Sequence, residues 1–76
     1  MIDIRATGQG IRNLAKERKI TAEEIQKRMG FTTRTPIYKW FNGQTLPSLD
    51  NLLILSEMLG VTVEEIIIRT EGEKKE

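Results

Sequence analysis

Helix start and stop signals alternate at short intervals along this chain, and they leave room only for short helices. A threonine followed three residues later by a glutamate forms the capping-box pattern that opens helices, and it occurs at 21–24 and at 62–65. Ser48 precedes another apolar segment and suits a similar capping role. Three glycines stand where apolar segments end and suit a left-handed helix terminus: Gly30, Gly43 and Gly60. Between these signals apolar residues recur at helical spacing, without a long alternating strand pattern.

These start and stop signals predict an all-α fold, a compact bundle of five short helices. Thr7 or Gly8 would cap the first helix. Thr33 would cap the third, which places Pro36 in the first turn, where proline is tolerated. The expected helices are Gln9–Lys19, Ala22–Met29, Arg34–Phe41, Leu49–Leu59 and a last one that follows Thr62 and runs through Ile68.

Composition narrows both the domain organisation and the chemistry. One domain is expected for 76 residues, spanning 1–69 with its core at 9–68, followed by a charged flexible tail at 70–76. The absence of cysteine and histidine removes disulfides, thiolate or histidine catalysis, and metal sites built from those ligands. We therefore expect no catalytic residues, no metal and no cofactor, and an enzyme is the weakest of the functions considered. Without a secretory signal or an apolar run long enough to cross a bilayer, the expected location is cytoplasmic.

Charge is distributed unevenly, although the net charge is only +1. Residues 1–47 hold nine Lys/Arg and four Asp/Glu, a balance of +5, whereas residues 48–76 hold three Lys/Arg and seven Asp/Glu, a balance of −4. A basic half can make one face attractive to phosphate while the whole chain stays near neutral. An ordinary solvated surface with chance clustering explains the same numbers equally well.

The second and third expected helices, with the short turn between them, have the layout of a helix-turn-helix. In that motif the second helix presents its first residues to base edges in the major groove of DNA. Ile37 and Trp40, three residues apart, would form the buried side of this helix.

Several short motifs in a fixed order make the pattern more specific. They are IRNL at 11–14, ITAEEI at 20–25, MG at 29–30, IYKW at 37–40, NG at 42–43, LPSL at 46–49 and LGVTVEEI at 59–66. Together they resemble the Cro/CI-type (Xre-like) helix-turn-helix family of phage and bacterial regulators, over about Gln9 to Ile68. The resemblance implies a lambda-repressor-like five-helix fold that binds double-stranded DNA. We expect a sequence-specific transcriptional repressor that acts as a homodimer.

The sequence departs from the family pattern around the turn. Eleven residues separate Gly30 from Asn42 where the common pattern has ten, and we place the extra residue in the turn, at Phe31 or Thr32. The glutamine that in the family follows the cap of the second helix and touches phosphate is Ala22 here, so that contact is lost. The small residue usual at Gln26 is also lost, which indicates an altered approach of the two helices.

The helix-turn-helix layout and the family resemblance select candidate DNA contacts. An arginine at the start of the third helix can donate two hydrogen bonds to one guanine. The predicted base contacts are Arg34, Thr35, Tyr38 and Lys39. The predicted phosphate contacts are Thr32, Thr33, Asn42, Gln44, Thr45, Lys27 and Arg28. At the two ends of the third helix, hydroxyls, amides and free backbone N–H groups suit phosphate, although capping and turn formation explain the same residue types.

The sequence leaves two questions open, the function of the fold and the role of three isoleucines. A protein-interaction module of the same fold, such as an antitoxin, is the alternative function, because Ala22 and the longer turn both weaken the match to DNA-binding members. Ile54, Ile67 and Ile68 are more apolar than surface positions require, so they form either a self-association patch or a slightly apolar helix face.

Overall fold

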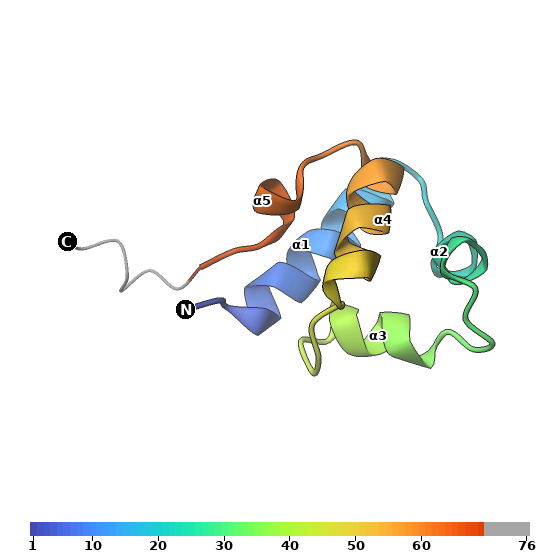
Figure 1. Cartoon of the computed structure of the whole chain (residues 1–76), viewed down its shortest axis with the longest axis horizontal. Helices are drawn as coiled ribbons and strands as arrows, with labels where there is room; N and C mark the ends of the chain where they lie inside the picture. The colour runs from blue at the N-terminus through green and yellow to red at the C-terminus, as the bar shows by residue number, and fades with distance from the viewer. Residues whose placement is uncertain (70–76) are drawn as a thin grey trace.

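Five helices make up most of the part of the chain that the computed structural model describes, residues 1–69 (Figure 1). In chain order they are α1 (Ile4–Glu17), α2 (Ala22–Met29), α3 (Thr35–Phe41), α4 (Leu49–Leu59) and α5 (Val63–Ile66). The expected all-α, five-helix architecture is confirmed, with an isolated β-bridge between Ile2 and Arg69 as the one β pairing within residues 1–69. The predicted tail at 70–76 lies outside the described residues. Among the helices described, none is long and apolar enough to cross a bilayer.

The helices pack around one apolar core. In Figure 1, α1 and α4 occupy the middle of the molecule, α3 lies across one end, and α2 and α5 flank the central pair on opposite sides. α3 contacts α1 and α2, α2 also contacts α4, and α5 contacts both α1 and α4. The buried apolar side chains are Ile11, Ala15, Ile25, Ile37, Trp40, Leu52, Leu55, Leu59 and Ile66. Every helix contributes to this core, so removal of the apolar surface from water ties all five together.

The capping signals act as predicted at α2, α4 and α5. Thr21 with Glu24, and Thr62 with Glu65, each form a complete capping box, in which side chain and backbone satisfy one another in both directions. The Ser48 side chain accepts a hydrogen bond from the backbone of the first turn of α4. The helix-ending glycines have left-handed backbones: Gly30 (φ 77°), Gly43 (φ 74°) and Gly60 (φ 72°). Local sequence therefore sets the bounds of α2 and α4 as expected.

The predicted start of the first helix is wrong. α1 begins at Ile4, with the Asp3 carboxylate accepting a hydrogen bond from the Ala6 N–H at 3.0 Å, five residues before the expected start. Gly8 lies inside the helix instead of capping it, and a Cβ at this position would overlap the carbonyl oxygen of Trp40 in α3. Glycine is therefore required at position 8 because the backbones of α1 and α3 approach closely there. The prediction that this glycine marks the start of the helix is wrong.

The last helix is also shorter than predicted, because the chain after it becomes extended and pairs with the start of α1. α5 ends at Ile66, and the residues that follow include the bridge to Ile2. The buried hydroxyl of Thr7 accepts a hydrogen bond from the Ile68 N–H at 3.0 Å and donates to the Ile68 carbonyl at 3.4 Å. The Asp3 N–H donates to the same carbonyl at 2.7 Å. These contacts between distant parts of the chain outweigh the local preference for another helical turn.

The close approach at Gly8 can be tested by adding one methyl group. Gly8→Ala is expected to lower the free energy of unfolding by about 1–3 kcal/mol, because the Cβ pushes α1 away from α3. Gly10→Ala is the matched control, since its Cβ would meet Ile68 Cδ1 at an ordinary 3.5 Å. Helix propensity should make that variant more stable by up to about 1 kcal/mol. Chemical denaturation measures both changes, and equal effects at the two glycines would contradict the packing described here.

Candidate nucleic-acid interface

The start of α3 differs from the prediction by one residue. Arg34 is the N-cap and provides no side-chain cap, so the prediction that Thr33 caps this helix is wrong. A Thr33 cap would place Pro36 at the third helical position, which has no N–H for the cap to bind. With Arg34 as N-cap, the third position is Ile37, whose N–H donates to the Arg34 carbonyl at 3.0 Å. The backbone thus satisfies the donor that a side chain would otherwise have capped.

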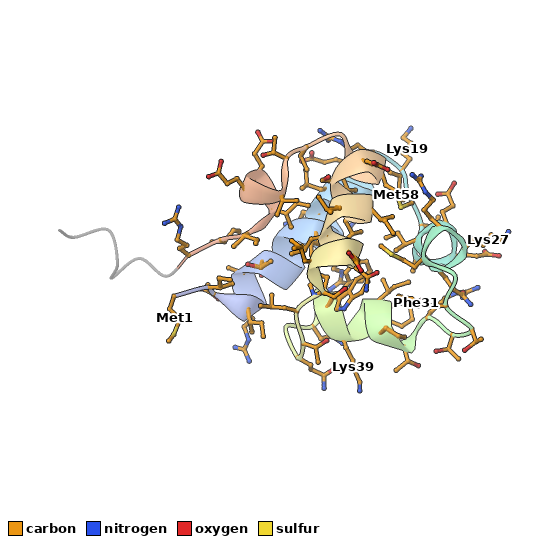
Figure 2. All side chains as sticks on the ribbon, in the orientation of Figure 1. Met1, Lys19, Lys27, Phe31, Lys39 and Met58 are labelled. Carbon is orange, nitrogen blue, oxygen red and sulfur yellow. The ribbon has the colours of Figure 1, made fainter. Side chains whose placement is uncertain are left out.

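The inner face of α3 holds the helix firmly in place. Ile37 is completely buried and Trp40 is 3% exposed, which confirms the predicted core pair. Phe31, in the turn before α3, meets the Trp40 ring edge-to-face with centroids 5.8 Å apart. Figure 2 shows Phe31 between α2 and α3. The longer turn is therefore itself packed against the core, which limits how α3 can shift.

The outer face of α3 is exposed, as predicted. Thr35 and Lys39 are exposed, and Tyr38 retains 47% exposure despite an edge-to-face contact with Phe41 at 6.2 Å. In Figure 2 the Lys39 side chain points away from the rest of the molecule. Three of the four predicted base contacts, Arg34, Thr35 and Tyr38, line one shallow hollow together with Thr33 and Gln26, whereas Lys39 lies outside it.

Arg34 has partners in α2 that the sequence analysis did not identify. Its Nε–H donates to Gln26 Oε1 at 3.2 Å, and its Nη2 lies 3.8 Å from Glu23 Oε1. Gln26 Nε2 in turn donates to the carbonyl of Phe31 at 3.2 Å. The signal in the sequence was a long polar side chain at a position that usually holds a small residue beside the turn.

The two predicted phosphate contacts on α2 have different surroundings. Lys27 is on the outer side of this helix (Figure 2), with its side chain 77% exposed and its Nζ 4.0 Å from Glu23 Oε2. Arg28 instead joins α2 to α4, with its Nη2 2.9 Å from Glu57 Oε1. Lys27 is the more available cation, because Arg28 would have to leave Glu57 to reach a phosphate.

At the ends of α3, side chains are available but some backbone groups are not. The predicted phosphate contacts at these ends all have exposed side chains: Thr32, Thr33, Asn42, Gln44 and Thr45. The expectation of free N–H groups after α3 is wrong. The Asn42 N–H donates to the Tyr38 carbonyl at 2.9 Å, and the Gln44 and Thr45 N–H groups donate to the Lys39 carbonyl at 2.9 and 3.4 Å. Asn42, Gln44 and Thr45 therefore have only their side chains left for phosphate contact.

The exposed apolar surface differs from the predicted patch. Ile54 and Ile67 are half-buried, and Ile67 packs against the core, which leaves Ile68 with 39% exposure. The larger exposed side chains of α4 are Leu49, at 68%, and Leu53, at 51%, one turn apart. Leu49 and Leu53 therefore offer one apolar surface to a partner on α4, while Met1, Ile2, Leu46 and Ile68 are exposed elsewhere.

Comparison with known proteins agrees with this geometry. A family model described as helix-turn-helix matches residues 11–66, most of the chain. The restriction-modification controller protein C.AhdI from Aeromonas hydrophila has a similar structure, with a TM-score of 0.73 and 26% identity, covering 84% of this chain and 96% of that protein. The DNA-binding domain of BldD shares the fold, with a TM-score of 0.69 and 13% identity over 87% of this chain and 94% of its own. No curated protein sequence matches the chain. The chain belongs to the helix-turn-helix family of DNA-binding regulators, of the Cro/CI (Xre-like) type.

Proposed function

We propose that this protein is a sequence-specific regulator that places α3 in the major groove of duplex DNA and represses transcription. The observation that carries the proposal is the two-sided character of α3. Its inner face is fixed by Ile37 and Trp40, while Thr35, Tyr38 and Lys39 on its outer face are exposed. A rigid helix with an exposed polar face can enter a groove about 12 Å wide without rearrangement of the core.

The side chains on this face suit recognition of bases. The guanidinium of Arg34 can donate two hydrogen bonds to O6 and N7 of guanine, a contact that contributes about 1–3 kcal/mol of discrimination. The Tyr38 hydroxyl can donate to phosphate, and its ring can contact a thymine methyl. Lys39 reaches bases or phosphate. Thr35 can donate to or accept from a base edge.

The charge distribution supports the same orientation. Four of the nine cationic residues in 1–47 lie on α2, on α3 or at the N-cap of α3, namely Lys27, Arg28, Arg34 and Lys39. Lys27 on α2 would meet the backbone beside the groove that α3 occupies. Contacts of this kind fix the position of the protein on DNA without selecting a sequence.

We further propose that two copies bind paired half-sites about 34 Å apart, one helical turn of DNA. Occupying that DNA would exclude other proteins from it, so repression needs no second activity. The exposed apolar residues of α4, Leu49 and Leu53, are the candidate contact between copies.

Sedimentation across a concentration series, with and without DNA, tests the pairing. A dimer is expected at high concentration, and Leu53→Glu should shift it to monomer, because a charge would be buried in the contact. The control is Gln9→Glu, which adds the same charge at an exposed position of α1 and should leave the mass unchanged. A protein that stays monomeric under all these conditions contradicts the pairing.

Selection of bound sites from random duplex DNA tests the function itself and supplies the probe for variants. Arg34→Ala is expected to weaken binding to the selected site about 5- to 150-fold and binding to random DNA much less, because it removes a base contact as well as one positive charge. Lys27→Ala should weaken both sites alike and reduce the salt dependence by about one ion, because it removes a phosphate contact. Binding measured over a salt series separates the two patterns. Failure to enrich any motif, or equal losses for both variants, would contradict the proposal and favour a protein-binding role.

A further inference from the structure

Two residues of α2 hold the guanidinium of Arg34 from different sides. We propose that Gln26 is a positioning residue that aims Arg34 at the base edge, and that Glu23 competes with DNA for the same guanidinium, so that α2 residues set the specificity of an α3 side chain. The inference rests on the proposed function, because it concerns the use that Arg34 makes of DNA.

The hydrogen bonds of Gln26 run in a fixed direction. Arginine has only donors, so the side-chain oxygen of Gln26 must face Arg34 Nε, at 3.2 Å. The amide nitrogen of Gln26 then faces the carbonyl of Phe31, also at 3.2 Å. Neither a carboxylate nor an aliphatic side chain could make both bonds. Gln26 is half-buried, so these two bonds tie the turn and Arg34 to the same point on α2.

Holding Arg34 through Nε leaves its outer edge available. The two terminal nitrogens are the donors that match O6 and N7 of guanine. An unrestrained arginine loses side-chain entropy when it is fixed, and a side chain already oriented loses less on binding. Gln26 should therefore strengthen the base contact of Arg34 without touching DNA.

Glu23 acts in the opposite direction. Its carboxylate lies 3.8 Å from Arg34 Nη2 and 4.0 Å from Lys27 Nζ, so one anion is shared between two cations predicted to contact DNA and partly offsets their charge. All three side chains are about half exposed or more, and ion pairs that exposed are weak. At the selected site a guanine can replace Glu23 with two directed hydrogen bonds, whereas binding to random DNA depends mainly on phosphate contacts. The carboxylate should thus reduce binding to random DNA more than binding to the selected site.

Affinities for the selected site and for random DNA test the role of Gln26. Gln26→Met keeps the size of the side chain and removes both hydrogen bonds, and it should weaken binding to the selected site about 3- to 10-fold with little change on random DNA. The loss should disappear when Arg34 is already alanine, because coupled residues are not additive. Gln9→Met, on the exposed side of α1, is the control and should change neither affinity.

Glu23→Gln should strengthen binding to random DNA by about 2- to 5-fold and to the selected site by less, which lowers the specificity ratio. Glu64→Gln is matched to it, because both glutamates occupy the second position of a helix, in α2 and α5 respectively. The control removes the same charge away from Arg34 and should leave the ratio unchanged. Equal effects of the two variants would overturn the role of Glu23.

The outcomes separate this inference from the proposed function. If Arg34→Ala lowers specificity while Gln26→Met does not, the positioning role is wrong and the regulator function stands. If Arg34→Ala itself has no effect on specificity, the proposed base contact of Arg34 is contradicted, whatever Gln26→Met does. Should Gln26→Met not fold, the Nε–H nuclear magnetic resonance signal of Arg34 in the free wild-type protein decides. Exchange with water slower than that of exposed Arg12 supports the bond, and equally fast exchange overturns it.

Discussion

Burial of Ile37 and Trp40 is the interaction on which the rest of the structure depends. These side chains fix one face of α3 in the core, and the fixed face determines which residues the opposite face exposes. The backbone of Trp40 also approaches α1 closely, at a point where only the missing side chain of Gly8 leaves room. Packing of α3 therefore constrains α1 as well. A seven-residue helix is too short to be stable alone, so its orientation has to come from these tertiary contacts.

At the candidate interface, positive side chains are paired with glutamates, so the surface is not uniformly basic. Lys27, Arg28 and Arg34 each have a glutamate partner in the free protein, at distances of 4.0, 2.9 and 3.8 Å. Exposed ion pairs of this kind are easily exchanged for phosphate or base contacts. The same pairs weaken the electrostatic attraction to DNA of any sequence. A net charge of +1 is still compatible with DNA binding, because these cations can leave their glutamate partners for DNA.

Sequence alone predicted what depends on neighbouring residues, and it failed where distant segments meet. The bounds of α2 and α4 follow from local caps, and the burial of Ile37 and Trp40 follows from helical spacing. The start of α1 was missed because Gly8 serves a contact with α3 and not a helix end. The end of α5 was missed because Ile68 pairs with Thr7, 61 residues away. In the site, the exposed face of α3 was predictable, whereas the hold of Gln26 on Arg34 depends on the path of the longer turn.

We propose that the outer face of α3 is the surface that meets DNA. Backbone amide nuclear magnetic resonance shifts during titration with a short duplex at low ionic strength test it most directly. If α3 enters the groove, the largest shifts will fall at 32–39 and on α2, with α5 unaffected. Shifts concentrated on α4 and α5, or no salt-dependent shifts at all, would contradict it.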